Sequence, residues 1–438
     1  MGDGAARIII IKGGVSLNKK HKERIILVMI LAAMLASCAP SAYGENPSAQ
    51  QAPLPQDAMQ ADDTAAVDQI TQSQPAPRVL REDRSYIFVE RNTNAADGGV
   101  ERLVDRMYYQ GLPLHRTANA PHGLIAADDV VLFKINCQWA ERGGTNTDVI
   151  RGFAQAVAAH PDGFVGEIII ADNGQGQFGT YGTGGSLDWS RPNSLYGDQS
   201  TMDVINALRE EGIRISGYLW DDIAMVRVSE FYDGDFTDGF VVGSDIFPTG
   251  LEISYPKFTT VYGTNVSFKN GIWDSVAGDF NSEQLRIINM PVLKSHFIFQ
   301  QTGAVKNYMG IVANRLTQFR SHNSVGTGGM GTLMAETRMP VLNVMDMIWT
   351  GAGLGPGSTN DSAVETRAIA VSTDAFALDY WATREFLLPH LSGQQAALAD
   401  PLSSDPDSFG HWLRLSANEV EARGLRAELD SDRIMLIE

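Results

Sequence analysis

A group of lysine, asparagine and histidine residues in this sequence has the chemistry of an anion-binding site. A lysine ammonium is a compact positive charge, and an asparagine amide both donates and accepts hydrogen bonds. Lys134 and Lys294 lie at the ends of apolar, β-branched runs, where a ligand crevice is more expected than a surface charge. For a lone lysine, a solvated surface position remains the simplest alternative. The candidates are Lys134, Asn136, Lys294, His296, Lys306 and Asn307.

The segment 284–335 has no acidic residue over 52 positions, although the chain average of 52 acids in 438 residues would place about six there. The same segment carries five basic residues, Arg286, Lys294, Lys306, Arg315 and Arg320. The formal net charge of the whole chain is −18, so this segment is a local positive field in an acidic protein. Positive charge focused in a cleft raises the local concentration of anions. We therefore expect a small anionic or polar ligand, and no nucleic acid, which requires a basic surface.

Two histidines belong to the same candidate site. His296 lies two residues after Lys294, on the same side of an extended strand. It could act as a general acid or base near neutral pH, with Lys294 and Lys306 as catalytic partners that stabilise negative charge. His322 is a candidate substrate-binding residue directly before the Gly/Ser-rich stretch 323–332, and we expect both to lie in one loop. A hydrogen-bonded structural histidine is the alternative for both.

Two aspartates are weak candidates for a metal site. Asp172 follows the apolar run EIIIA, and Asp346 lies within VLNVMDMI. Acids in such positions are paired or functional, and a salt bridge to one of the lysines is the simplest interpretation. With the histidines they could form an oxygen/nitrogen metal site, but no H-E-x-x-H, C-x-x-C or EF-hand pattern is present. The presence of a metal therefore stays open.

The elements that must position these residues are apolar runs separated by helical patterns. The runs are 129–135, 167–171, 213–219, 286–293, 341–348 and 367–372, and the terminal IMLIE is a further candidate strand. Continuous rather than alternating apolar character predicts strands that are covered on both faces. Helices are predicted after Thr147 and Thr201, and Ser416–Glu419 has the pattern of a capping box ahead of a helix. We expect an α/β fold with a mostly parallel sheet flanked by helices, in a single large domain with a possible subdomain at 173–285.

The first residues have the pattern of a targeting segment. A basic run precedes twelve apolar residues at 25–36, which is too short for a membrane span of about 20 residues. It ends in Leu-Ala-Ser-Cys and resembles a bacterial lipobox, so we predict a signal peptide at 1–37 and lipidation of Cys38. Ordinary cleavage after Gly44 is the alternative. A Pro/Gln/Ala/Ser-rich tether follows at 38–79, and the α/β domain occupies 80–438.

These features predict a location on the periplasmic side of the cell envelope. Ala39, rather than Asp, after the cysteine points to an outer-membrane lipoprotein that contacts the membrane only through its lipid anchor. Without residues 1–37 the chain carries 28 basic against 50 acidic residues, a net charge of −22.

The stretch 286–310 reads RIINMPVLKSHFIFQQTGAVKNYMG and resembles the domain-of-unknown-function 362 family. In that family a strand ending in N-x-P-x-x-K-x-H precedes a T-G-x-x-K-N-x-x-G block. The matching residues are Asn289, Pro291, Lys294, His296, Thr302, Gly303, Lys306, Asn307 and Gly310. Weaker matches are the K-x-N at 134–136, His322, the strand at 343–346 and the D-x-x-A-x-D block at 374–379. The resemblance covers about 125–385 and implies that Asn289 and Thr302 also belong to the substrate-binding site.

The resemblance implies a fold and a site rather than a reaction. Relatives of this family carry a ferredoxin-like module, but the two cysteines of this chain exclude a self-contained iron–sulfur cluster. One of them, Cys137, is best interpreted as a small buried hydrophobe. The leading hypothesis is an envelope protein that binds, and could transform, a small anionic or polar substrate in a Lys/His/Asn pocket at strand ends. A non-catalytic solute-binding lipoprotein and a redox accessory protein that uses a separate electron carrier are the alternatives.

Overall fold

The computed structural model describes residues 80–174, 184–353, 355 and 362–438. The predicted signal peptide at 1–37, the lipidation site Cys38 and the tether at 38–79 lie outside these residues. None of the described helices is long and apolar enough to cross a lipid bilayer.

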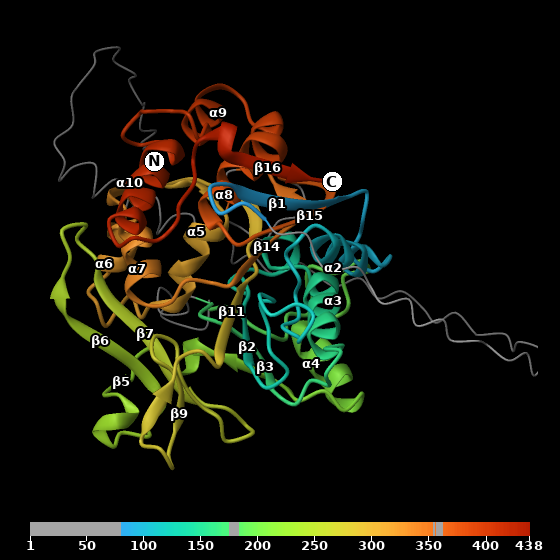
Figure 1. Ribbon diagram of the computed structural model, residues 1–438. Helices are drawn as coiled ribbons and strands as arrows, with labels where there is room; N and C mark the ends of the chain where they lie inside the picture. The colour runs from blue at the N-terminus through green and yellow to red at the C-terminus, as the bar shows by residue number, and fades with distance from the viewer. Residues whose placement is uncertain (1–79, 175–183, 354, 356–361) are drawn as a thin grey trace, which may run out of the picture. The chain divides into compact units, whose positions relative to one another are not determined.

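A ten-stranded mixed sheet forms the centre of the fold (Figure 1). Its strands are β1 (Ser85–Arg91), β2 (Val130–Lys134), β3 (Glu167–Asp172), β4 (Ile215–Leu219), β11 (Leu285–Asn289), β12 (Val292–His296), β13 (Gln300–Thr302), β14 (Leu342–Gly351), β15 (Ala363–Ser372) and β16 (Ile434–Ile437). The order is β16-β1-β15-β14-β11-β2-β3-β4, and β12 pairs with β13 and β14. Neighbouring strands from β14 to β4 are parallel, so their carboxyl ends meet at one edge. The expected α/β fold with a mostly parallel sheet is confirmed.

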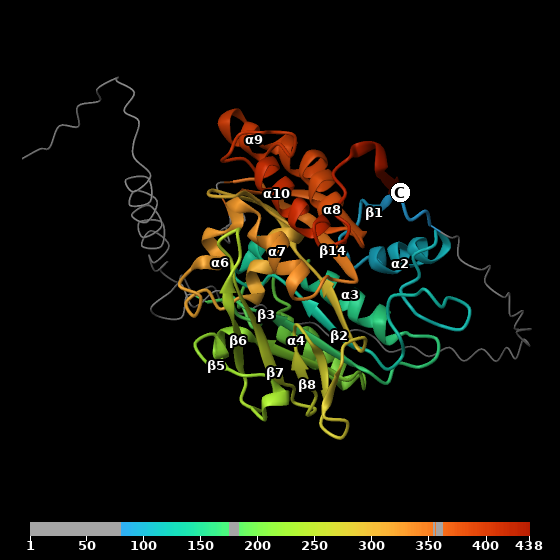
Figure 2. The same ribbon diagram turned by 60° about the vertical axis from the view of Figure 1, so that its left-hand side comes forward.

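Helices cover both faces of this sheet (Figure 2). One face is covered by α2 (Gly99–Tyr109), α3 (Thr147–Ala158) and α4 (Thr201–Glu210). The other is covered by α5 (Ala304–Asn307), α7 (Gly329–Glu336), α8 (Ala375–Ala382) and α10 (Phe409–Glu421), with α6 (Arg320–Asn323) and α9 (Gly393–Ala399) nearby. Successive residues of β2 therefore face different hydrophobic cores: Leu132 packs into one and Phe133 into the other. Burial on both faces explains why the strands have continuous apolar sequences.

A second sheet of six short strands lies beside the first. It consists of β5 (Arg227–Val228), β6 (Gly239–Ile246), β7 (Glu252–Thr259), β8 (Asn265–Ser267), β9 (Gly271–Asp274) and β10 (Asp279–Asn281), paired in the order β10-β9-β8-β7-β6-β5. All its pairings are antiparallel except β5–β6. Phe240, Phe258 and Phe268 belong to the same core cluster as Trp220 and residues of α5, α7, α8 and α10. The second sheet thus shares a core with the first, and residues 80–438 belong to one compact unit.

The expected strand 286–293 is in fact two strands. Pro291 separates β11 from β12, since proline has no N–H to continue a ladder. After this break β12 pairs in parallel with β14 and continues to His296. The terminal strand is confirmed, because β16 pairs in parallel with β1.

Two local expectations in the C-terminal half are wrong. The predicted helix start at Ser416 lies inside α10, which begins after Ser408, whose hydroxyl accepts a hydrogen bond from the backbone N–H of His411. Burial of Phe409 and Trp412 extends this helix toward its N-terminus. The stretch 323–332 is not one loop, because His322 lies in α6 and α7 begins at Gly329.

Candidate functional site

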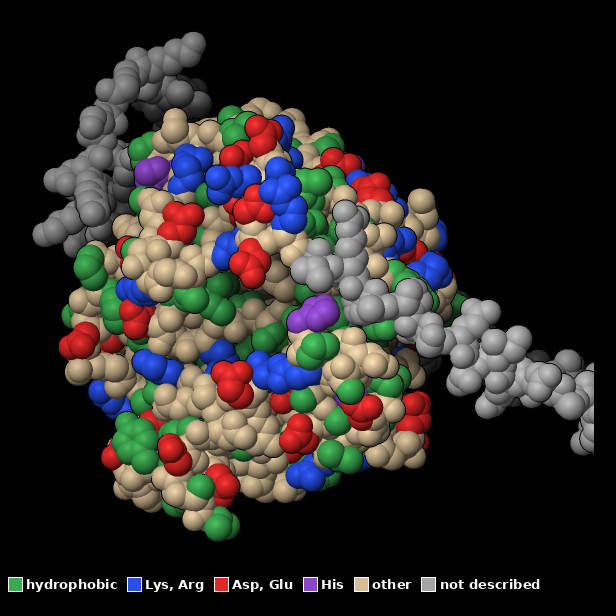
Figure 3. All heavy atoms as spheres, in the orientation of Figure 1, with side chains coloured by type: hydrophobic (Ala, Val, Ile, Leu, Met, Phe, Trp, Pro, Cys, Tyr) green, Lys and Arg blue, Asp and Glu red, His purple; other side chains and the backbone are tan. Residues whose placement is uncertain are grey.

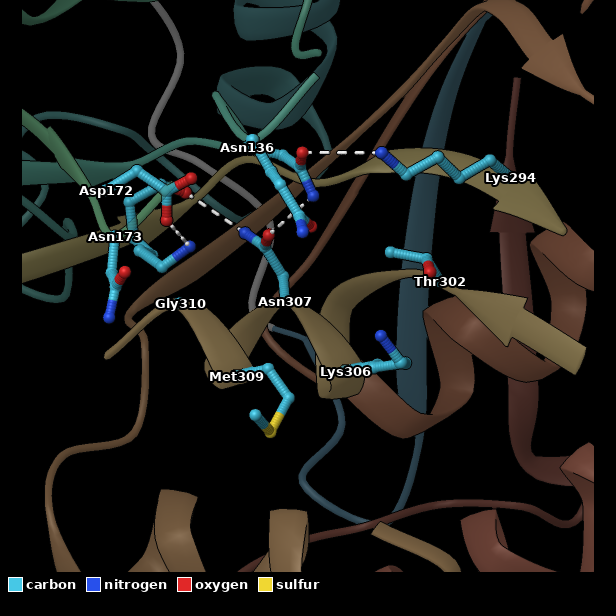
Figure 4. A pocket seen from close by; sticks show the side chains of 11 residues that line it. Asn136, Asp172, Asn173, Lys294, Thr302, Lys306, Asn307, Met309 and Gly310 are labelled. Atoms are coloured by element: carbon cyan, nitrogen blue, oxygen red, sulfur yellow. Dashed lines mark hydrogen bonds and ion pairs between the residues drawn. The ribbon is translucent and has the colours of Figure 1, made fainter. Parts of the chain in front are cut away.

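A polar pocket lies at the carboxyl ends of β2 and β3 (Figure 4). It encloses about 310 Å³, its open mouth included. It is lined by Lys134, Asn136, Gln138, Asp172, Asn173, Lys294, Thr302, Lys306, Asn307, Met309 and Gly310. The sequence analysis singled out eight of these eleven residues. The structure therefore brings together side chains from β2, β3, β12, β13 and α5, as expected for a ligand site at the edge of a parallel sheet.

Lys134 and Asp172 form a buried ion pair in the pocket. The Lys134 Nζ lies 2.5 Å from Asp172 Oδ1 and donates to the carbonyl oxygen of Ile135 at 2.7 Å. Asp172 Oδ2 accepts from the backbone N–H of Cys137 at 2.7 Å. A Cβ at Gly310 would collide with both Asp172 and the Lys134 ammonium. The last glycine of the T-G-x-x-K-N-x-x-G block is thus explained by close packing against this pair.

Four asparagine amides connect α5 to the strand ends. Asn136 Nδ2 donates to Asn307 Oδ1 at 3.4 Å, and Asn307 Nδ2 donates to Asn289 Oδ1 at 2.8 Å. Asn289 Nδ2 in turn donates to Asn343 Oδ1 at 2.9 Å. Asn289 therefore does not line the pocket, but it accepts a hydrogen bond from Asn307, which does. Asn343 was not among the predicted site residues, although a polar residue inside the apolar run 341–348 is a signal for it.

Lys294 extends from β12 into the pocket and has only uncharged partners. Its Nζ donates to Asn136 Oδ1 at 3.4 Å and to the carbonyl oxygen of Gly143. The side chain is buried, and no ion pair joins it to a described carboxylate. Burial, followed by the nearby charge of Lys306, lowers the pKa of Lys294 to about 7.

Lys306 faces the same space from α5, on the other side of Thr302 (Figure 4). Its residue surface is only 7% exposed, and its ammonium lies 5.5 Å from the centre of the Phe299 ring. Within the described part of the chain it makes neither an ion pair nor a hydrogen bond. Burial lowers its pKa to about 7. Between the two lysines, the hydroxyl of Thr302 is buried and has no partner among the described residues.

Asp379 holds the helix that carries Lys306 and Asn307. Its Oδ1 accepts from the N–H of Ala304 at 2.6 Å, and its Oδ2 accepts from the N–H of Val305 at 3.0 Å. A Cβ at Gly303 would collide with this carboxylate, so the T-G step of the motif makes room for it. Burial raises the pKa of Asp379 to about 7. Each acid of the D-x-x-A-x-D block thus has a structural function. Asp374 caps α8, and Asp379 holds the start of α5.

The two histidines lie next to the pocket and do not line it. His296 Nδ1 accepts hydrogen bonds from the N–H groups of Ile298 and Phe299, at 3.1 and 3.2 Å, which assigns the proton of the neutral ring to Nε2. Burial and the nearby Lys306 charge hold the pKa of His296 well below its usual value. The same causes lower the pKa of His322 to about 4, and its ring packs against Phe299. In this state the His296 ring can donate a hydrogen bond from Nε2, and its role as an acid/base group stays a prediction.

The weak metal candidates have other partners. Asp346 accepts from the N–H groups of Asn146 and Ile348, at 2.8 and 3.0 Å, next to the start of α3. It does not line the pocket, and burial raises its pKa to about 6. Across the described residues, no three His, Cys, Asp or Glu side chains are grouped so that they could hold a metal ion. Cys137 is buried, as expected, and burial raises the pKa of its thiol well above the usual value.

The charge balance in the pocket differs from that on the surface. Acidic and basic side chains are interspersed over the face shown in Figure 3. The pocket instead combines three lysines with one aspartate. Of the other basic residues in the acid-free segment, Arg286 pairs with Asp129 at 3.1 Å and Arg320 with Glu252 at 3.4 Å. Of the five basic residues in that segment, Lys294 and Lys306 are the two that line the pocket.

The family comparison matches the segment that carries α5. Residues 275–384 match the family model described as domain of unknown function (DUF362). A thylakoid-associated protein of Synechocystis sp. is 30% identical over 128 residues, which cover 26% of this chain and 39% of that protein. The chain thus matches less than half the length of that relative. No solved structure matches the chain. The matched segment contains β11 to α8, and with it Lys294, Lys306 and Asp379, so the similarity to the DUF362 family covers the part of the pocket that β12, β13 and α5 build.

Proposed function

We propose that the pocket binds a small anionic or polar ligand through Lys294 and Lys306. The observation that carries this proposal is a pair of buried lysines that face one space without a carboxylate partner. Burying an unpaired ammonium is costly, and two close to each other also repel. A bound anion would supply the negative charge and the hydrogen-bond acceptors that the two buried ammonium groups lack.

The remaining groups fit a binding site with room for chemistry. Lys134 and Asp172 neutralise each other and orient the strand ends, while the Asn136–Asn307 contact fixes α5. His296 contributes a neutral ring close to Lys306. In a reaction, the two ammonium groups would stabilise negative charge that develops on the substrate.

The proposal is tested by what copurifies with the protein and by one substitution. Mass spectrometry and elemental analysis of the folded protein should find a small anionic or polar compound. Lys306→Ala should abolish its binding while the unfolding transition stays cooperative. Lys269→Ala removes a lysine outside the pocket and is the matched control. An unchanged ligand affinity in Lys306→Ala would falsify the proposal.

The distinction between an enzyme and a binding protein depends on turnover. If the bound compound is released chemically unchanged, and no product appears in a broad substrate panel, the protein is a non-catalytic solute-binding protein. Product formation that is lost in Lys306→Ala supports an enzyme. Anaerobic spectroscopy of the purified protein tests a redox accessory function, which predicts a bound cofactor.

We further propose that the chain is a lipoprotein of the cell envelope, anchored through Cys38. The support is the basic run, the short apolar stretch and the Leu-Ala-Ser-Cys ending of residues 19–38. Metabolic labelling with palmitate should label the wild type and not Cys38→Ser. Equal labelling of the two would contradict this anchor.

A further inference from the structure

The charges that face the pocket leave two positive groups uncompensated. The Lys134–Asp172 pair is neutral as a unit, and its two groups are 2.5 Å apart. His296 and His322 are neutral at physiological pH, because burial holds both pKa values below the usual range. Asp346 is held by two backbone N–H groups away from the lining. When Lys294 and Lys306 are both protonated, a ligand that balances them carries two negative charges.

The donor types favour a tetrahedral oxyanion over a planar carboxylate. Arginine recognises carboxylates because its planar fork matches their two oxygens, whereas lysine acts as a point charge and is a frequent phosphate ligand. Among the described residues that line the pocket, the cations are all lysines. Lys294 and Lys306 approach the space from β12 and α5, on opposite sides of Thr302 (Figure 4). Point charges on different sides suit oxygens that project in several directions.

A second cavity next to the pocket has a different character. It encloses about 270 Å³ and shares Asn136 with the first. Trp139, Trp189, Leu187 and Pro192 are among its lining residues. The indole N–H of Trp189 donates to the carbonyl oxygen of Cys137 at 3.0 Å, which fixes that ring. An organic group that extended from an anion in the first pocket into this cavity would meet apolar and aromatic surface.

We infer that the ligand carries a phosphate-type dianion, which binds between Lys294 and Lys306. This inference rests on the proposed function, because it names the ligand class of the same site. The shared chemistry is the doubly charged phosphoryl group. It can come from free phosphate or from a phosphate monoester whose organic part lies in the tryptophan-lined cavity.

Isothermal titration calorimetry on the full chain tests the inference with defined probes. Sulfate and inorganic phosphate are tetrahedral dianions, malonate is a dianion with planar carboxylates, and acetate is a planar monoanion. We expect sulfate and phosphate to bind about tenfold more tightly than acetate or malonate, or better. Lys306→Met should weaken sulfate binding by about tenfold or more, because it removes one charge-assisted contact. Lys269→Met should leave it unchanged.

The pH dependence provides a second readout. Sulfate keeps its charge between pH 6 and 8.5, so any change in its affinity reports on the protein. Both lysines have pKa values of about 7, so the affinity should fall as the pH rises through 7, with proton uptake on binding. Phenyl phosphate distinguishes the two sources. Tighter binding than inorganic phosphate, lost in Trp189→Ala, supports a monoester, and equal affinities support free phosphate.

Three results would overturn the inference. The first is that acetate or malonate binds more tightly than sulfate and phosphate. The second is that Lys306→Met leaves sulfate binding unchanged, and the third is that no tetrahedral anion binds. If a neutral polar compound or a carboxylate copurifies with the protein and requires Lys306, the proposed function stands and the phosphate assignment fails.

Discussion

Two lysines of this protein are buried over a phenylalanine ring, but they differ in what surrounds their charge. In the second sheet, the Lys257 ammonium lies 4.5 Å from the centre of the Phe231 ring, donates to the carbonyl oxygen of Asp235 at 2.5 Å and lies 3.8 Å from the Asp235 carboxylate. Glu230 and Asp238 add further negative charge. Lys306 has a similar ring contact, with Phe299, and no carboxylate partner among the described residues.

This difference separates a lysine that serves the fold from one that serves a ligand. Burial lowers the pKa of Lys257, and the acids around it offset part of that effect, whereas burial alone lowers the pKa of Lys306 to about 7. At Lys306 nothing in the described chain offsets that cost. The chain therefore retains a group that destabilises the empty fold, as expected for a residue kept for binding.

The largest expected effect comes from removing each lysine in turn. Lys257→Met should lower the free energy of unfolding by about 2–4 kcal/mol, because it removes the hydrogen bond to the Asp235 carbonyl oxygen and the positive charge near the buried Glu230. Lys306→Met should leave stability unchanged or raise it, since it replaces an unpaired buried charge by an apolar chain of similar length. Urea unfolding of both variants measures the contrast. Equal losses in the two would show that Lys306 has a structural partner.

A smaller effect is expected from crowding the ion pair of the pocket. Gly310→Ala should cost about 1–3 kcal/mol, because the added Cβ would collide with Asp172 and the Lys134 ammonium. Gly326→Ala is the matched control, since no atom lies within 4 Å of its added Cβ, and should change stability by less than about 0.5 kcal/mol. Thermal unfolding compares the two variants. A Gly310→Ala protein as stable as the wild type would contradict the tight packing of this pair.

The pH dependence of stability should report on the two unpaired lysines of the pocket, Lys294 and Lys306. In the folded, ligand-free protein Lys294 and Lys306 have pKa values of about 7, below the ordinary lysine value of roughly 10.4. Between these values the unfolded chain binds more protons than the folded one, so the free energy of unfolding should rise with pH. Integrated over both lysines, we expect a rise on the order of 3 kcal/mol from pH 7 to 8.5.

Two variants test the origin of this rise in the free energy of unfolding. The rise should be about halved in Lys306→Met, in which one of the two titrating groups is gone. Lys269→Met should keep it in full. Urea unfolding at several pH values gives the measurement, and an identical pH profile in Lys306→Met and wild type would exclude Lys306 as a source of the rise.

The smallest effect compares two buried hydroxyl groups. The Thr302 hydroxyl in the pocket has no partner among the described residues, so Thr302→Val should change stability by less than about 0.5 kcal/mol. The Ser267 hydroxyl in the second sheet donates to Glu230 at 2.9 Å, and Ser267→Ala should cost about 1–2 kcal/mol. Chemical unfolding of both tests the contrast. A larger loss in Thr302→Val than in Ser267→Ala would contradict it.

Local patterns in the sequence predicted much of the fold and the content of the site. Continuous apolar runs identified the buried strands, because residues such as Leu132 and Phe133 both had to be apolar to face two cores. The positions of Lys134 and Lys294 at the ends of those runs identified both lysines as candidates for the site. The break at Pro291 and the true start of α10 were missed, since strand pairing and helix packing decided them rather than local sequence.

Only the tertiary structure decided how the charges are combined. The sequence by itself determined an acid-free segment, lysines at strand ends and a glycine-containing motif. It did not show that Lys134 pairs with Asp172 while Lys306 has no such partner, because these contacts follow from the order of β2, β3 and β12 in the sheet. It also gave no reason to assign Asp379 to the start of α5, 75 residues away in sequence. The strength of a buried charge depends on its neighbours and on its distance from water, and both are properties of the folded chain.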